Sequence, residues 1–244
     1  MKKVFSEEIL DIWDEAKDIK TFRVKRPADF SYVAGQECLV SLTDGRFPKK
    51  KSPMSIGSSP SDTSSFELTI KQYGTFTQTL HQLKVGDTIQ VQGPLGKVFR
   101  FDQIKQQKIV FLAAGTGLVP FMSILRYAHG NGLTNQFILI NSNKARENII
   151  YMEELSQIER SSPYFKMVHT LTHIAPQAWS GMKRRIDAKM IEQMVPTIKD
   201  WLFFVCGPAE MVLNSRDLLL NLGVSAGRIK FDPWGIQHEK KIQS

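Results

Sequence analysis

A glycine-rich turn after an apolar run is the sharpest chemical signal in the sequence. It reads Ala113-Ala114-Gly115-Thr116-Gly117-Leu118-Val119-Pro120 and follows the apolar run that begins at Ile109. Glycines let the backbone turn sharply and approach a ligand closely, and the free N–H groups of a following helix attract an anion. The turn therefore predicts a pyrophosphate site, with a turn that only packs a strand against a helix as the alternative. The spacing is not G-x-G-x-x-G, because Pro120 stands where the third glycine would be.

A second glycine closes another apolar run, in Cys206-Gly207-Pro208. In open α/β sheets, ligands bind beyond the carboxyl ends of the strands. We therefore expect Cys206 and Gly207 at the same rim as the first turn. The alternative is that Cys206 is a small buried apolar residue, which is the commonest fate of an unpaired cysteine.

A third group of small and hydroxyl-bearing residues lies in the first half of the chain. It consists of residues 52–60 (SPMSIGSSP), followed downstream by residues 74–77 (GTFT). Hydroxyls and glycines ahead of a helix that starts near Thr77 can hold a second phosphate group. A serine-rich loop between strands is the simpler alternative.

The elements that must position these residues change period halfway along the chain. Up to about residue 104 the sequence alternates in short strands, interrupted by one short helix over Thr77–Leu83. The strands are expected at Ile19–Lys25, Cys38–Leu42, Phe66–Lys71 and Thr88–Val91. Turn signals such as Ala34-Gly35 separate them, which predicts an all-β, antiparallel barrel. We expect a six-stranded barrel, of which these four strands are located from the sequence.

The second half alternates continuous apolar runs with helical stretches. The runs are Ile109–Ala113, Phe137–Ile140, Met167–Leu171, Leu202–Cys206 and Ile229–Phe231, and the helices are expected at Val119–His129, Ile149–Glu159, Ala188–Val195 and Glu210–Leu222. Strands that are apolar at every position are covered on both faces. This half therefore predicts an α/β doubly wound, five-stranded parallel sheet. The polar stretch at 102–107 connects the halves, so we place the domains at 1–104 and 105–244.

Composition excludes several classes of protein. Of 244 residues, 42% are hydrophobic and 23% charged, which is ordinary for a globular chain. The two cysteines, Cys38 and Cys206, lie in different halves and exclude a disulfide framework, a cysteine-rich zinc site and a four-cysteine iron–sulfur cluster. No run approaches the ~20 apolar residues of a membrane span, and the start lacks the apolar core of a secretory signal. We therefore expect a cytoplasmic protein without a metal.

The net charge of +8 indicates acidic partners. Apart from Lys49–Lys51 and Lys183–Arg185 the basic residues are scattered, and neither cluster is interleaved with aromatic residues. We therefore expect that the protein does not bind nucleic acid, and we rank a basic nucleic-acid-binding protein third among the possible functions. We also expect a monomer.

Taken in order, the motifs resemble the ferredoxin–NADP reductase superfamily from about Tyr32 to Trp234. The matching segments are Ala34-Gly35-Gln36, Ser55–Pro60, Gly74–Thr77, Leu83–Asp87, Gly93–Gly96, Gly115-Thr116-Gly117 with Pro120, and Cys206-Gly207-Pro208 with Met211. The resemblance implies an FAD-binding barrel, with FMN as the alternative flavin, followed by an NAD(P)-binding domain. The implied activity is a flavin-dependent NAD(P)H oxidoreductase, which passes a hydride from NADPH or NADH to the flavin and electrons to a separate acceptor. Ferredoxin, flavodoxin, an oxygenase component or a free quinone would serve as that acceptor.

The resemblance also assigns site residues. It places the flavin at Ser52, Met54, Ser55, Ile70, Lys71, Gly74, Thr75, Phe76, Thr77 and Trp234. It places the nicotinamide nucleotide at Gly115, Thr116, Gly117, Pro120, Ser142, Asn143, Lys144, Arg146, Cys206, Gly207, Pro208 and Met211. The implied catalytic residues are Ser55, which would reach flavin N5, Cys206, which with Thr116 would flank the nicotinamide, and Asp232 nearby.

Two departures from the family pattern bear on the cofactors. Relatives carry an arginine and a tyrosine where this chain has Ser52 and Met54, so a charge-assisted bond to a flavin phosphate is lost. The alternative function is therefore a non-catalytic pseudo-reductase, a nucleotide- or partner-binding module with weakened flavin binding. Lys144 and Arg146 are cations suited to a 2′-phosphate, which favours NADP over NAD.

Overall fold

The chain folds into two compact units. The computed structural model describes residues 3–42, 50–103 and 107–232. One unit comprises Met1–Gln103 and Val119–Asn131, and the other comprises Ile104–Leu118 and Gly132–Ser244. The helix after the glycine-rich turn thus groups with the first unit, whereas the strand before that turn belongs to the second. The division into domains 1–104 and 105–244 remains a prediction.

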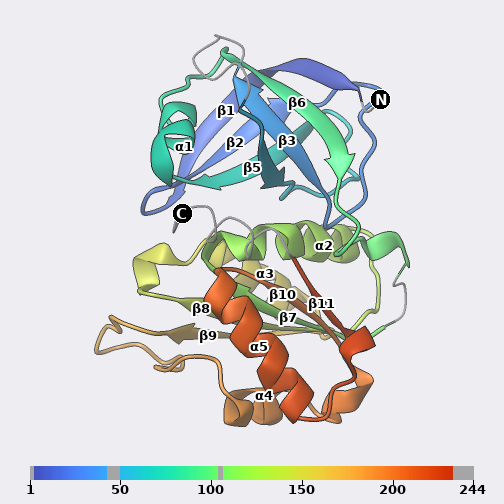
Figure 1. The fold of residues 1–244 in the computed structure, drawn as a ribbon, viewed down its shortest axis with the longest axis vertical. Coiled ribbons are helices and arrows are strands. Elements are labelled where there is room, and N and C mark those ends of the chain that lie inside the picture. Colours follow the sequence, from blue (N-terminus) through green and yellow to red (C-terminus); the bar gives the residue numbers. More distant parts are fainter. Residues whose placement is uncertain (1–2, 43–49, 104–106, 233–244) are drawn as a thin grey trace. The chain divides into compact units, whose positions relative to one another are not determined.

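The first unit is built on a six-stranded antiparallel sheet that confirms the expected barrel (Figure 1). The strands run in the order β4-β3-β6-β1-β2-β5, and an isolated bridge between Ile56 and Leu68 sets the end of β4 beside β5. Their bounds are β1 Val4–Ala16, β2 Ile19–Lys25, β3 Glu37–Leu42, β4 Ser52–Ser55, β5 Ser65–Lys71 and β6 Thr88–Leu95.

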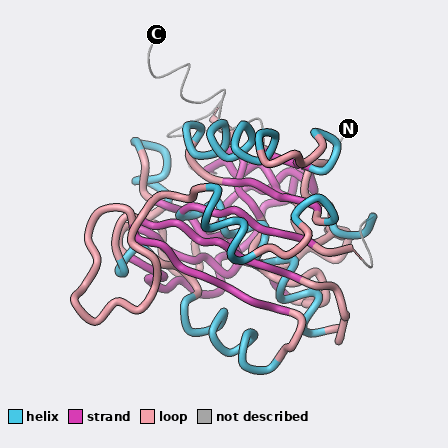
Figure 2. Tube along the Cα trace, turned by 90° about the horizontal axis from the view of Figure 1, so that it is seen from below, coloured by secondary structure: helices cyan, strands magenta, loops and turns pink. Residues whose placement is uncertain are grey.

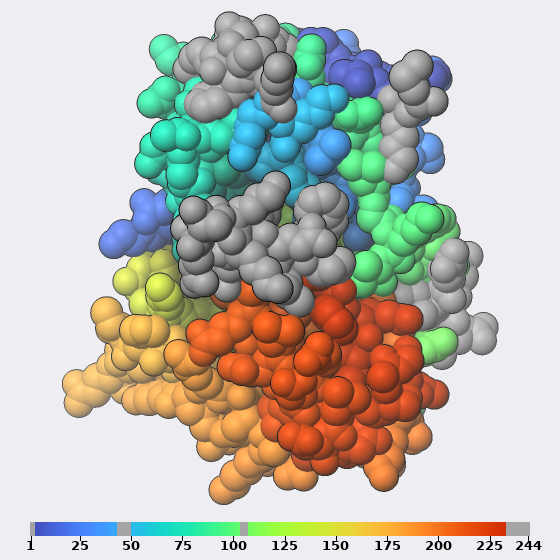
Figure 3. Space-filling view, viewed as in Figure 1, coloured from blue at the N-terminus to red at the C-terminus, as the bar shows by residue number. Residues whose placement is uncertain are grey.

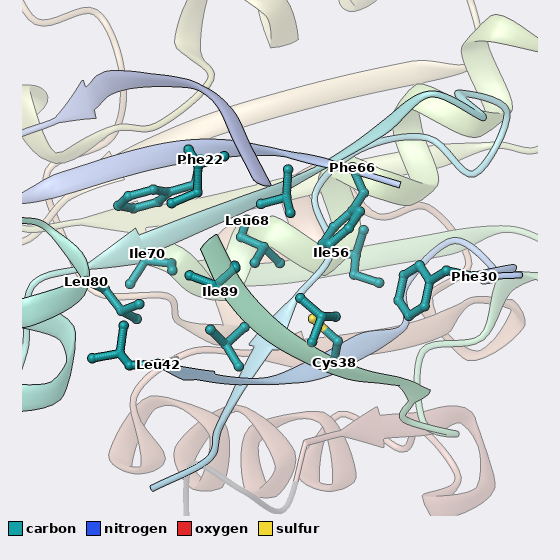
Figure 4. Close-up of a cluster of buried hydrophobic side chains, with 14 of the residues drawn as sticks. Phe22, Phe30, Cys38, Leu42, Ile56, Phe66, Leu68, Ile70, Leu80 and Ile89 are labelled. Atoms are coloured by element: carbon teal, nitrogen blue, oxygen red, sulfur yellow. The ribbon is translucent and has the colours of Figure 1, made fainter. Parts of the chain in front are cut away.

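Apolar side chains fill the interior of this sheet (Figure 4). Ile56, Phe66 and Leu68 are fully buried there, and Phe30 and Ile89 join the same cluster. These side chains occupy the interior of the barrel.

Two helices complete the first unit. Helix α1 (Gly74–Leu80) begins three residues before the expected start. The Thr77 hydroxyl lies inside its first turn, where it accepts a hydrogen bond from the Tyr73 amide and donates to the Tyr73 carbonyl, both at 2.6 Å. Helix α2 (Val119–Gly130) packs against the segment that follows β6. The rings of Phe121 and Phe99 meet edge to face there, with their centroids 5.1 Å apart.

The second unit is a five-stranded parallel sheet, as expected. Figure 2 shows the strands of the protein in magenta, seen from below. The strand order is β11-β10-β7-β8-β9, and every pairing is parallel. The bounds are β7 Ile109–Ala114, β8 Phe137–Asn143, β9 Phe165–Leu171, β10 Leu202–Cys206 and β11 Ile229–Phe231. Since each strand ends at the same rim, the segments that follow β7, β8 and β10 are neighbours.

Three helices cover this sheet: α3 (Met152–Ser161), α4 (Ala188–Met194) and α5 (Ala209–Asn221). Helices α4 and α5 share one apolar cluster with the sheet, and α5 lies on the surface of the unit (Figure 3, orange to red). Helix α3 starts three residues later than expected, because Tyr151 takes a left-handed backbone conformation with φ of 56°. Among the described residues, no helix combines the length and apolarity that crossing a membrane requires.

Candidate functional site

The glycine-rich turn presents open backbone at the rim of the parallel sheet. Strand β7 ends at Ala114, a 3₁₀ turn covers Gly115–Leu118, and α2 follows. Gly115 has a φ of +53°, and a Cβ atom added there would meet nothing within 4 Å. Backbone in this conformation is accessible to a ligand, as a phosphate cradle requires.

The second glycine run lies directly against the first. Cys206 pairs with Ala113 in the register of β10 and β7. A Cβ atom on Gly117 would lie 2.2 Å from the Cys206 carbonyl oxygen and 2.7 Å from the Gly207 nitrogen. The two turns therefore meet at one rim, as the sequence predicts, and their backbones approach so closely that only glycine fits at position 117. Open backbone at Gly115 and this close approach fit the phosphates of a nucleotide.

The remaining residues assigned to the nucleotide lie beside these turns. Ser142 and Asn143 end β8 and are buried, whereas Lys144 and Arg146 are exposed in the segment that follows. The Lys144 carbonyl accepts hydrogen bonds from the amides of His173 (3.1 Å) and Ile174 (3.0 Å), which ties the segment after β9 to this one. The lysine and arginine side chains are thus exposed cations on a backbone that is held in place.

The other members of the nucleotide set differ in exposure. Thr116, Cys206, Gly207 and Met211 are partly exposed, Pro208 is exposed, and Pro120 is buried in the first turn of α2. A Cβ atom on Gly207 would lie 2.5 Å from the Met211 Cε, so Met211 packs over this glycine. Asp232 follows β11 and is partly buried.

A buried polar pair, which the sequence analysis did not single out, lies one row inside the rim. Asn141 on β8 pairs in register with both Ala113 on β7 and His169 on β9. The Asn141 Nδ2 lies 3.3 Å from His169 Nδ1, and among the described residues nothing bonds Asn141 Oδ1 or His169 Nε2. Burial lowers the pKa of His169 to about 4, so the ring is neutral near pH 7. The sequence signal for this pair was a histidine inside the apolar run at Met167–Leu171 and an asparagine directly after the run at Phe137–Ile140.

Strand β4 contains the first three residues assigned to the flavin, Ser52, Met54 and Ser55. All four residues of the strand are partly exposed. Met54 lies opposite Cys38 and packs against the barrel core, and Ser52 lies opposite Val40. Ser55 alternates to the other face, opposite Glu37. Lys51 donates a hydrogen bond to Gln92 Oε1 at 2.9 Å, so β6 engages the lysine nearest to Ser52.

The end of β5 and helix α1 carry the rest of the flavin set. Lys71, Gly74 and Thr75 are exposed, and a ligand can reach their side chains or backbone. Ile70 and Phe76 are 3% and 5% exposed in the barrel core, so only their backbone is available to a ligand. Trp234 lies outside the described residues. Apart from Ile70, Phe76 and the internally bonded Thr77, the described residues assigned to the flavin are at least partly exposed, so a ligand can reach them.

Two domain models match the chain. The oxidoreductase FAD-binding domain matches residues 8–100, and the oxidoreductase NAD-binding domain matches residues 111–217. An antiparallel barrel of the first type followed by a parallel sheet of the second defines a flavin- and pyridine-nucleotide-binding module. The chain belongs to the ferredoxin–NADP reductase superfamily.

Two curated relatives are named as reductases. The chain is 28% identical over 228 residues to the glycine betaine monooxygenase reductase subunit of Pseudomonas aeruginosa, covering 91% of this chain and 62% of that protein. It is 29% identical over 222 residues to NADH-cytochrome b5 reductase 1 of Aspergillus terreus, covering 86% and 74%. The chain thus spans less than two thirds of the first of these relatives.

Solved structures share the fold. The ferredoxin NADP⁺ reductase from Neisseria gonorrhoeae with bound FAD and NADP superposes with a TM-score of 0.82 at 22% identity, covering 95% of this chain and 99% of that one. The cytochrome b5 reductase domain of Ulva prolifera nitrate reductase gives a TM-score of 0.83 at 22% identity, covering 94% and 97%.

Proposed function

We propose that this chain is an FAD-dependent NAD(P)H oxidoreductase that delivers electrons to a separate acceptor. The observation that carries the proposal is the close approach of Gly117 to Cys206 and Gly207 beside the open backbone of Gly115, in a chain with matched FAD- and NAD-binding domains. Bound FAD would supply a hydride acceptor and a carrier that can release electrons to the next protein.

The chain's own residues have distinct tasks in this proposal. The backbone of Gly115–Gly117 and the Cys206-Gly207 turn hold the nucleotide, while Thr116 and Cys206 orient the nicotinamide. The Ser55 side chain lies on the face of β4 that points away from the barrel core, and it offers its hydroxyl to the flavin ring. Asp232, at the end of β11, completes the set. These groups bind, orient and exclude water, because a hydride transfer needs no general acid or base.

Replacing Ser55 with alanine, or Cys206 with serine, is expected to slow flavin reduction by NADPH at least about tenfold, since misplacing the reacting rings raises the barrier to hydride transfer from nicotinamide to flavin. Stopped-flow bleaching of the flavin measures this rate directly. The matched control is Ser6→Ala, an exposed serine on β1, which should keep the wild-type rate. Wild-type rates in both site variants would show that the catalytic assignment is wrong.

We further propose NADP(H) as the preferred nucleotide, because Lys144 and Arg146 are exposed cations at the rim after β8. Changing both to glutamine is expected to lower the ratio of kcat/KM for NADPH to that for NADH at least about tenfold, since each charge-assisted phosphate bond contributes about 1.5–3 kcal/mol. Lys166→Gln, on β9 near the opposite end of the sheet, is the control. An unchanged ratio in the double variant would remove the basis for an NADP preference.

The acceptor that the chain's properties favour is an acidic electron-carrier protein or an oxygenase component. The net charge of +8 favours encounter with an acidic partner. Relatives named as a monooxygenase reductase subunit and as cytochrome b5 reductases support a protein acceptor.

A further inference from the structure

Helix α2 reaches back to the turn that follows Ser55 with two side chains. The Ser123 hydroxyl donates a hydrogen bond to the Ser58 carbonyl at 2.6 Å, and Ser123 is fully buried. Arg126 Nη1 donates to the Gly57 carbonyl at 2.9 Å. Gly57 and Ser58 come two and three residues after Ser55, so both contacts act on the segment that carries this proposed flavin ligand.

Glu67 on β5 fixes the arginine in place. Its Oε2 lies 2.8 Å from Arg126 Nη1, and the two side chains are only 13% and 17% exposed. Its Oε1 lies 3.2 Å from Arg23 Nη2, and the Arg23 side chain is 42% exposed. Arg126 is thus the more buried of the two cations on one carboxylate, and it is the one that also bonds the turn.

The backbone and side chains of the barrel hold the same turn from the other side. The Gly57 amide donates to the Glu67 carbonyl at 2.8 Å, and the Glu67 amide donates to Ser58 Oγ at 2.9 Å. The Tyr32 hydroxyl lies 2.9 Å from Ser58 Oγ. The Ser58 carbonyl also accepts a hydrogen bond from the Tyr32 hydroxyl, at 3.2 Å. Helix α2 therefore supplies the closer of two donors to the Ser58 carbonyl, through Ser123, and the Arg126 donor to the Gly57 carbonyl. A buried carbonyl that loses its hydrogen-bond donor raises the free energy of the folded chain. We therefore expect the turn to shift until water can bond the carbonyl.

We propose that Ser123 and Arg126 are positioning residues for the flavin site. By bonding the Ser58 and Gly57 carbonyls they hold the segment after Ser55 in the geometry that binds flavin, and Glu67 holds Arg126 for this task. The proposal rests on the proposed function, because it assumes that Ser55 and its neighbours contact FAD.

The test uses the full-length chain freed of flavin, in the variants Ser123→Ala, Arg126→Gln and Arg126→Lys. The dissociation constant for FAD is measured by flavin fluorescence, and hydrogen exchange is followed at the amides of residues 56–59 and 61. We expect Arg126→Gln to raise the dissociation constant at least about tenfold and Ser123→Ala about three- to tenfold, with faster exchange in this segment. Arg126→Lys keeps the charge beside Glu67 and should recover part of the affinity.

Two controls separate positioning from general stability. Arg23→Gln removes the other cation from Glu67 but touches neither carbonyl, and it should leave FAD affinity within about twofold. Ser156→Ala removes a serine of α3 whose hydroxyl donates to the Met152 carbonyl of the same helix, and it should also leave FAD affinity within about twofold. If Arg126→Gln does not fold, Ser123→Ala decides the question.

The outcomes are distinct. Wild-type FAD affinity in Ser123→Ala, and in Arg126→Gln where it folds, would overturn the positioning role while leaving the reductase proposal intact. Equal losses in Arg23→Gln would also overturn it, since the effect would then come from the barrel as a whole. A wild-type chain that binds no flavin would instead overturn the proposed function itself.

Discussion

Gly117→Ala is expected to lower the free energy of unfolding by about 3 kcal/mol and to abolish nucleotide binding, because the new methyl group would displace two turns at once. Its Cβ would lie 2.2 Å from the Cys206 carbonyl oxygen and 2.5 Å from the carbonyl carbon. These are backbone atoms at the end of β10, and they cannot rotate away as a side chain would. Relief therefore requires that β10 and the turn after β7 separate, which moves Cys206 as well.

Chemical denaturation of the full chain, followed by titration with NADPH, measures both effects. Gly227→Ala is the matched control in the same unit, since a Cβ there meets nothing within 4 Å and the residue is exposed. Its free energy of unfolding should change by less than about 0.5 kcal/mol. Equal stability of the two variants would contradict the close approach of the turns on which the nucleotide site depends.

Stability is expected to fall as the pH drops from about 6.5 towards 4, because His169 is buried and neutral in the folded chain. Its pKa is lowered from 6.5 to about 4 by loss of hydration. Between these values the unfolded chain binds a proton that the folded chain does not, so acid favours unfolding. A shift of this size corresponds to about 3 kcal/mol, present above pH 6.5 and lost as the pH falls through 4.

Free energies of unfolding measured from pH 4 to 7 for the wild type and His169→Gln test this expectation. The variant should have a flatter profile, whereas His173→Gln, at an exposed histidine four residues later, should keep the wild-type slope. Burial also lowers the pKa of His81, which makes acid destabilise the folded chain in the same way. The contribution of His169 is therefore the difference in slope between the wild type and His169→Gln. A wild-type slope in His169→Gln would show that His169 is not the group responsible.

Local pattern predicted most of the architecture. The bounds of β2, β10 and β11 agree with expectation, because an alternating run or a continuous apolar run bounded by polar residues has few other solutions. Strand β1 was not located from its sequence. Its apolar residues do not alternate cleanly between faces, since Val4 and Leu10 are 50% and 40% exposed and register shifts interrupt its pairing with β2.

The sequence predicted the parts of the candidate site that topology brings together. It did not predict which individual side chains are available to a ligand. The meeting of the two glycine turns follows from the rule that parallel strands end at one rim. A motif match cannot tell a backbone contact from a side-chain contact, so Ile70 and Phe76 were assigned to the flavin although their side chains lie in the core. The contact of Arg126 with Glu67 joins residues 59 positions apart, and no local period encodes it.

The most direct test of the account is the visible absorption spectrum of the purified chain, with and without added FAD, followed by anaerobic addition of NADPH. The account predicts a yellow protein that releases FAD on denaturation and is bleached by NADPH, despite the serine at position 52. A colourless chain that takes up neither FAD nor FMN would contradict it and would support the non-catalytic alternative, with the loss of positive charge at Ser52 as the physical reason.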